Sequence, residues 1–312
     1  MATKIALAGI GKIAVDQHVP ALNASPDWDL AATVSRHGTV DGVESFSDFA
    51  TMLKERPDIG VVSLCLPPVP RFAYAKAALE AGRHVMLEKP PGATISESLA
   101  LEAMARKAGL SIYATWHSRE AEGVAGAKAW LQGKVLKKLA VTWKEDVRRW
   151  HPGQAWIWQA GGLGVFDPGI NALSIVTEIL PHAIHLKSAD LLFPENCETP
   201  IAADLSFYHP QGADVGAVFD FRQEGEQTWS IDIETDAGSL SLTDGGAHLF
   251  INGERQAAGD AGLTLAGEYP RLYAKMAALV KAGGIDMDIA PMAHVADAFL
   301  LGKRITVEPF HE

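Results

Sequence analysis

The chain has 312 residues, of which 48% are hydrophobic and 21% charged, so it is long enough for two domains with separate cores. Its 27 basic and 38 acidic residues give a net charge of −11, which argues against nucleic acid or an anionic membrane as the main partner. The two cysteines have no zinc-ligand spacing, and no apolar run is long enough to cross a bilayer. We therefore expect a cytoplasmic protein with no metal site.

Apolar strands alternate with helices over the first 120 residues. The pattern predicts strands at 4–10, 29–34, 60–66, 84–87 and 111–115. It predicts helices at 14–24, 46–55 (capped by Ser45 or Ser47), 71–81 and 95–108. Alternation with short connections is typical of a doubly wound parallel sheet, so residues 1–120 are expected to form a dinucleotide-binding Rossmann domain.

The pattern changes in residues 121–312, where half-exposed strands follow one another. They are expected at 136–146, 184–192, 202–208, 216–222, 228–235, 239–242 and 248–251. Turn signals such as Asn252-Gly253 separate them, which predicts a large, mostly antiparallel open sheet. With helices at 268–282 and 290–303, this half is expected to be an α+β domain whose last helix can pack back on the first domain.

A dinucleotide fingerprint of the form G-x-G-x-x-A follows the first strand. Gly9 permits a tight turn, Gly11 lets the backbone approach a pyrophosphate, and Ala14 allows close packing of helix and strand. The intervening Lys12 and Ile13 head the helix, whose N-terminus favours the phosphates. This placement, directly between a strand and a helix, makes the motif specific.

The second strand ends in Ser35, Arg36 and His37, where an NAD-specific site usually has an acidic residue. A hydroxyl and a guanidinium can bind a 2′-phosphate, so we expect NADP as the cofactor, with NAD also accepted. Alternatively, Arg36 only stacks on the adenine. Pro67, at the end of the third strand, is expected to complete this side of the site.

The segment Glu88-Lys89-Pro90 ends the fourth strand, because proline forces the preceding residue into an extended conformation. Lys89 should therefore stand at the carboxyl edge of the sheet, where ligands bind in open α/β folds. The alternative is a solvated lysine in a turn. Glu88 and Lys89 are included in the expected cofactor site.

Together with the fingerprint and Glu88-Lys89-Pro90, the segment Gly161-Gly-Leu-Gly-Val-Phe-Asp167-Pro-Gly-Ile-Asn171 carries a resemblance to the glucose–fructose oxidoreductase / inositol dehydrogenase (Gfo/Idh/MocA) family. The resemblance covers the whole chain. Residues 143–171 are most similar to bacterial members that oxidise the anomeric carbon of L-arabinose or D-galactose to a lactone. The resemblance also implies a homo-oligomer, namely a dimer whose subunits pair through the open sheet.

By this resemblance Lys89, Asp167 and Asn171 take the reacting positions. The implied contacts of an aldopyranose substrate are His117, Glu145, Trp150, His151, Asp167, Asn171 and Trp229. Many relatives carry histidine where this chain has Asn171, and an amide cannot take up a proton. The proton of the substrate hydroxyl must then go to Asp167, Lys89 or water; we expect Asp167 to accept it and Lys89 to position and relay.

Two features allow a purely structural interpretation. Asp167-Pro168 also fits a helix N-cap followed by proline. Trp143, Trp150, Trp156 and Trp158 suit the apolar faces of a pyranose, but the last two alternate as in ordinary sheet packing. Other functions remain open: a dehydrogenase of another sugar, cyclitol or dihydrodiol, or a non-catalytic sensor of NADP.

Overall fold

The computed structural model describes residues 2–257 and 267–311. The chain forms two compact units, residues 1–117 with 265–289 and residues 118–264 with 290–312. Helix α8 (Glu268–Ala282) therefore belongs to the first unit, although it comes late in the sequence. The last helix, α9 (Ala290–Leu301), belongs to the second unit.

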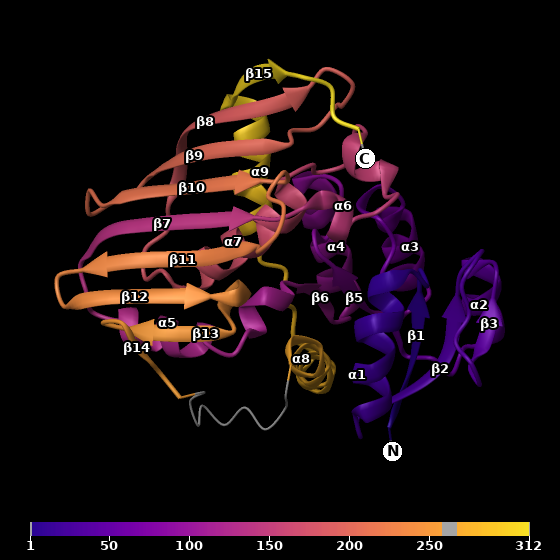
Figure 1. The fold of residues 1–312 in the computed structure, drawn as a ribbon. Helices are drawn as coiled ribbons and strands as arrows, with labels where there is room; N and C mark the ends of the chain where they lie inside the picture. Colours follow the sequence, from indigo (N-terminus) through magenta and orange to yellow (C-terminus); the bar gives the residue numbers. More distant parts are fainter. Residues whose placement is uncertain (1, 258–266, 312) are drawn as a thin grey trace. The chain divides into compact units, whose positions relative to one another are not determined.

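The first unit contains a six-stranded parallel sheet in the order β3-β2-β1-β4-β5-β6, as expected of a doubly wound fold. Figure 1 shows it in indigo and purple. In sheet order the strands are Glu44–Phe46, Trp28–Val34, Thr3–Ala8, Val61–Leu64, His84–Glu88 and Ile112–Thr115. The strand order reverses between β1 and β4, which is where open α/β sheets bind ligands.

Helices cover both faces of this sheet. One apolar cluster joins it to α2 (Phe49–Glu55), α3 (Pro68–Glu80) and α4 (Ile95–Ala108). A π-helical turn (Ala14–His18) and α1 (Val19–Ala24) follow β1, and α1 shares the other cluster with α8. Helix α8 covers much of the sheet face on which α1 lies, and its Leu272 and Met276 are fully buried there.

One local prediction in this unit is wrong. The predicted helix at 46–55 begins only at Phe49, because the Asp48 side chain caps it by accepting the Thr51 N–H at 2.7 Å. Neither Ser45 nor Ser47 is the cap. The preceding residues, Glu44–Phe46, instead form the edge strand β3.

The second unit contains a nine-stranded sheet in the order β14-β13-β12-β11-β7-β10-β9-β8-β15. In that order the strands are Glu254–Arg255, His248–Ile251, Gly238–Thr243, Thr228–Thr235, Leu136–Lys144, Asp214–Asp220, Ala202–Tyr208, His185–Pro194 and Lys303–Val307. Only the β7–β10 and β8–β15 pairs are parallel among these described strands, so the predicted antiparallel character is confirmed.

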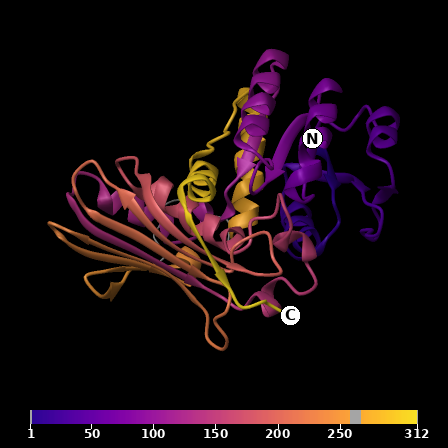
Figure 2. The same cartoon turned by 90° about the horizontal axis from the view of Figure 1, so that it is seen from above.

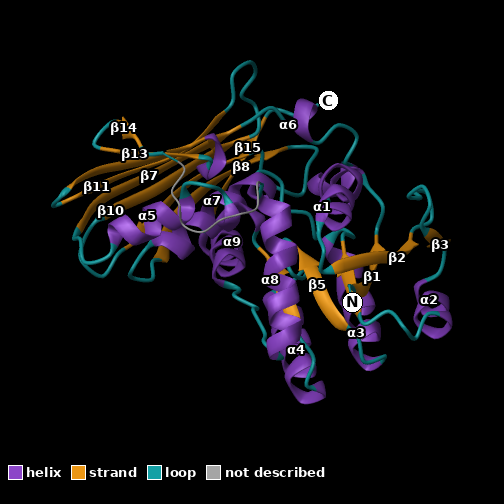
Figure 3. Ribbon diagram, turned by 90° about the horizontal axis from the view of Figure 1, so that it is seen from below, coloured by secondary structure: helices purple, strands orange, loops and turns teal. Residues whose placement is uncertain are grey.

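Helices cover one face of this larger sheet (Figure 2 and Figure 3). They are α5 (Val124–Leu131), α7 (Phe166–Ile179) and α9, while α6 (Val147–Trp150) follows β7. Phe207 and Phe219 point into this core, where Phe219 packs edge-to-face on Phe166. Tyr208 and Val218 are exposed. Pairing of two copies through such positions stays a prediction, and sedimentation equilibrium can decide whether the protein is a dimer.

Within the described residues no helix combines the length and apolar character needed to span a lipid bilayer.

The start of α4 offers a test of the first unit. Thr94 accepts the Glu97 N–H, while the Glu97 carboxylate accepts the Thr94 N–H, which forms a complete capping box. We expect Thr94→Ala to lower the free energy of unfolding by about 1 kcal/mol. Urea denaturation followed by circular dichroism measures it. Thr94→Ser keeps the hydroxyl and should unfold like wild type; equal losses in both variants would contradict the capping role.

Candidate functional site

The fingerprint loop has the geometry that a dinucleotide requires. Gly9 has a φ of +91°, and a Cβ there would lie 2.9 Å from the backbone nitrogen of Leu66, so a side chain is excluded. A Cβ on Gly11 would meet no heavy atom within 4 Å, which leaves its backbone open to a pyrophosphate. Lys12 and Ile13 follow as exposed residues just before the π-helical turn.

The end of β2 borders a cavity of about 340 Å³. It is lined by Gly9, Val34, Ser35, Arg36, His37, Ser47, Leu66 and Tyr74, and none of these is a carboxylate. Pro67 is the cap residue of α3, next to Leu66. The cavity therefore suits a group with an extra negative charge. Sequence patterns did not indicate Ser47, Leu66 or Tyr74 as residues of the cofactor site, because these three come together only through the packing of strands and helices.

The Glu88 carboxylate is buried at the end of β5 and accepts three hydrogen bonds. Its Oε1 contacts the His18 Nε2 at 3.1 Å and accepts the Tyr269 hydroxyl at 2.9 Å. Its Oε2 accepts the backbone N–H of Lys89 at 2.9 Å. Burial by itself would raise the pKa of Glu88, but His18, with smaller contributions from His117 and Lys89, holds it at about 2.

His18 and His117 both pack against Tyr269, which donates a hydrogen bond to this carboxylate. Burial favours the neutral imidazole of His18, yet Cys65, Tyr273 and Glu88 together raise its pKa. Burial likewise opposes the charged form of His117, but Glu268, 2.7 Å from its Nδ1, raises its pKa. The His117 ring also stacks on Tyr269. The first unit thus contributes His117, Glu88 and Lys89 to the predicted site.

In the second unit, residues from four parts of the chain form a compact polar cluster. His151, after α6, places its Nε2 3.4 Å from the Glu145 carboxylate and 3.8 Å from that of Asp167. Trp229 on β11 donates its Nε1–H to Glu145 at 2.9 Å. Trp150 packs edge-to-face on Trp229 at a ring separation of 5.3 Å. Five residues predicted from separate stretches of sequence are therefore neighbours in space.

Asp167 lies in the first turn of α7, which begins at Phe166 after the cap residue Val165. The alternative that Asp167 is the N-cap of this helix is thus wrong. Gly164, with a φ of +54°, allows the chain to turn into the helix beside the Pro200 carbonyl, where a Cβ would lie only 2.3 Å from the oxygen. Asn171 follows four residues later and so lies on the same face of α7 as Asp167.

The other tryptophans of this region have different surroundings. Trp143 is buried in the core of the sheet. Trp156 and Trp158 lie in a short 3₁₀ helix (Ala155–Trp158), so the alternation that suggested strand packing does not reflect a strand. Trp158 packs on Phe221, which in turn contacts the His151 ring. Phe221 was not singled out in the sequence, because its place beside His151 depends on the pairing of β7 with β10.

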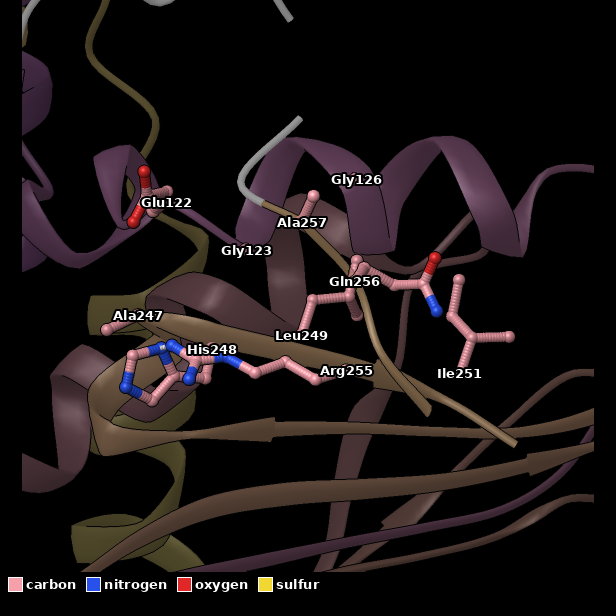
Figure 4. A pocket seen from close by; sticks show the side chains of 10 residues that line it. All are labelled: Glu122, Gly123, Gly126, Ala247, His248, Leu249, Ile251, Arg255, Gln256 and Ala257. Carbon is pink, nitrogen blue, oxygen red and sulfur yellow. Dashed lines mark hydrogen bonds between the residues drawn. The ribbon is translucent and has the colours of Figure 1, made fainter. Parts of the chain in front are cut away.

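A further pocket of about 610 Å³ lies between the start of α5 and strands β13 and β14 (Figure 4). Arg255 reaches across it to His248, with 2.8 Å between Nη2 and Nδ1, and His248 also pairs with Asp244. None of its lining residues belongs to the predicted site, so its size alone does not make it the candidate site.

Comparison with known proteins agrees with the fold and the motifs. Residues 3–115 match the Gfo/Idh/MocA oxidoreductase family, which has an NAD-binding Rossmann fold. The chain is 43% identical to the galactose 1-dehydrogenase of Pseudomonas fluorescens, over 99% of each chain. It therefore belongs to this family of nucleotide-dependent oxidoreductases.

Two solved structures are also similar. The crystal structure of a D-galactose-1-dehydrogenase protein from Rhizobium etli has 53% identity and a TM-score of 0.94, covering 99% of this chain and 98% of that one. The 3-ketoreductase KijD10 from Actinomadura kijaniata, in complex with NADP and TDP-benzene, has a TM-score of 0.83 at 19% identity, covering 98% of this chain and all of the other. The second likeness concerns the fold alone.

The fingerprint geometry can be tested by adding one methyl group. Gly9→Ala places a Cβ against Leu66 in a backbone conformation that alanine disfavours, so we expect the dissociation constant for NADPH to rise about tenfold or more, equivalent to at least about 1.4 kcal/mol. Fluorescence titration measures it. Gly60→Ala, where no heavy atom lies within 4 Å of the new Cβ, is the matched control. Unchanged affinity in Gly9→Ala would rule out the proposed turn.

Proposed function

We propose that the protein is an NAD(P)-dependent aldose 1-dehydrogenase that oxidises the anomeric carbon of D-galactose and L-arabinose to the lactone, with NADP as the preferred acceptor. Similarity over nearly the whole chain to two galactose 1-dehydrogenases supports the reaction class. L-arabinose has the same ring stereochemistry and differs at the C5 substituent. A pocket contact with one such small group changes binding by only about 1–3 kcal/mol, so one site can accept both sugars.

The observation that carries this proposal is the cluster formed by Glu145, His151, Asp167 and the pair Trp150 and Trp229. A pyranose has apolar C–H faces and a rim of hydroxyl groups. The indole rings suit the faces, and the carboxylates and the imidazole suit the hydroxyls. Because Glu145 and Asp167 are both buried, their acceptor oxygens are directed by the fold rather than by solvent.

The chain's own residues have to orient the sugar and take up the proton of its 1-hydroxyl. When bound, the nicotinamide supplies the hydride acceptor. Asp167 accepts the hydroxyl proton, Lys89 holds that oxygen and relays the proton, and Asn171 donates or accepts a hydrogen bond without changing its protonation. His151 lies near both carboxylates, with its Nε2 3.4 Å from that of Glu145 and 3.8 Å from that of Asp167.

The fingerprint loop and the cavity at the end of β2 would hold the cofactor. Gly9 and Gly11 leave room for the pyrophosphate, and Ser35 and Arg36 would bind the 2′-phosphate. The Ser35 hydroxyl oxygen accepts the backbone N–H groups of His37 and Gly38, so its own proton remains available for donation. This arrangement supports a preference for NADP over NAD.

Absorbance at 340 nm with a panel of aldoses and NADP tests the reaction. D-galactose and L-arabinose should be turned over, whereas tight NADPH binding without turnover of any sugar would favour a sensor. We expect Lys89→Met and Asp167→Asn each to lower kcat by about 10²–10⁴-fold. The exposed residues Lys107 and Asp190 offer matched controls, since Lys107→Met and Asp190→Asn should behave like wild type. Full retention of kcat in either site variant would exclude the shared role.

Arg36 gives a separate test of cofactor choice. Arg36→Ala removes the guanidinium from the cavity, so the affinity for NADPH should fall about 10-fold to 100-fold, as for loss of a charged hydrogen bond. The affinity for NADH should hardly change, because it has no 2′-phosphate. Equal losses for both nucleotides would mean that Arg36 stacks on the adenine instead.

A further inference from the structure

A buried hydrogen-bond network lies directly behind Lys89, and its least expected member is His18. This histidine is the last residue of the π-helical turn after the fingerprint and is only 1% exposed. Its Nδ1 contacts the Tyr273 hydroxyl at 2.7 Å, and its Nε2 contacts the Glu88 carboxylate at 3.1 Å. Such π-helical turns are rare and are often found at functional sites. Both ring nitrogens of His18 are therefore engaged by the protein.

Glu88 transmits this contact to the backbone of Lys89. One of its oxygens is held by His18 and Tyr269, and the other accepts the Lys89 N–H. A buried carboxylate is stable only when it is paired and hydrogen-bonded. His18 is the basic partner in direct contact with it, and it also fixes the direction in which the second oxygen points.

Arg71 holds the same segment from the other side. Its guanidinium is buried and donates to the backbone carbonyl oxygens of Glu88, Pro90 and Leu66. The Glu88–Lys89 peptide group and the Pro90 carbonyl, on either side of Lys89 in the sequence, are therefore each tied to a buried side chain. The lysine's Cα has little freedom, so the direction in which its side chain leaves the sheet edge is set by these contacts.

We propose that His18 is a positioning residue for Lys89: it holds the Glu88 carboxylate against the Lys89 amide and so fixes the backbone from which the lysine extends. The inference rests on the proposed function insofar as Lys89 acts in the reaction. Without His18, the Glu88 carboxylate lacks its basic partner and must take up a proton, admit water or turn away. In each case the acceptor of the Lys89 N–H is weakened.

A positioning role predicts a kinetic effect that a role in packing alone does not predict. A misplaced Lys89 lowers the rate of the chemical step, whereas the fingerprint loop and the polar cluster of the second unit still bind cofactor and sugar. A displacement of about 1 Å far from the reacting atoms can cost about 100-fold in rate. The expected signature is a loss in kcat with little change in the KM for the sugar or in the affinity for NADPH.

The test compares two variants of His18 with a control on the same strand. His18→Leu removes the donor, and His18→Gln keeps a neutral donor toward Glu88. His84→Gln is the control, because His84 starts β5 at its opposite end, where its Nδ1 accepts the Ser111 N–H. Steady-state kinetics with NADP and D-galactose, NADPH titration, and hydrogen exchange of the Lys89 amide by NMR of ¹⁵N-lysine-labelled protein are measured for each; Lys89→Arg assigns the resonance.

We expect His18→Leu to lower kcat about 100-fold, with KM and the NADPH dissociation constant within about threefold of wild type. The Lys89 amide should exchange faster. His18→Gln should lose less in each respect, and His84→Gln should resemble wild type. If His18→Leu does not fold, the intermediate effect of His18→Gln on kcat and on exchange carries the test.

Several results would overturn the proposal. Wild-type kcat and Lys89 exchange in His18→Leu would do so, as would a loss of kcat matched by equal losses in cofactor and sugar binding or reproduced by His84→Gln. If wild-type protein turns over no sugar, the proposed function fails separately. Exchange of the Lys89 amide then decides: faster exchange in His18→Leu supports the positioning role, and unchanged exchange contradicts it.

Discussion

The buried carboxylate of Glu88 is the interaction on which the first unit's part of the site depends. It ends a strand at the sheet edge, where its own backbone can no longer continue the ladder past Pro90. By accepting the Lys89 N–H, the side chain satisfies a donor that the strand leaves behind. The cost of burying this charge is offset by His18 and Tyr269, which come from the dinucleotide-binding turn and from α8. Two distant segments therefore stabilise one lysine position through the neighbouring Glu88.

The second unit builds its part of the site by a different means. Its carboxylates lie at the end of β7 and the start of α7, and His151 lies near both. The flanking indoles are held by an edge-to-face contact and by the hydrogen bond from Trp229 to Glu145. Such a cluster can present several hydrogen-bond acceptors without large rearrangement, which suits recognition of a sugar by its hydroxyl groups. Under the proposed function, the first unit would hold the cofactor and the second would bind the sugar.

Local signals allowed much of this arrangement to be predicted from the sequence. Helical spacing ending at Gly109 predicted α4 at Ile95–Ala108, and alternation between turn residues predicted β9, β11 and β13. Signals that depend on distant partners were less informative. Strand β15 has a short sequence that pairs only because β8 has a free edge, and α8 joins the first unit because one face of its sheet needs apolar cover. The sequence around His18 gives no sign that Glu88, 70 residues later, lies against it.

We propose that Lys89 and Asp167 act on the same oxygen of the sugar. A crystal structure of the protein with NADPH and D-galactose tests it most directly, because the reduced nicotinamide cannot accept the hydride and the sugar remains intact. We expect the 1-hydroxyl oxygen to lie within hydrogen-bond distance, about 3 Å, of both the Lys89 Nζ and an Asp167 carboxylate oxygen. A sugar bound with its 1-hydroxyl away from either group, or the two side chains directed into separate cavities, would contradict it.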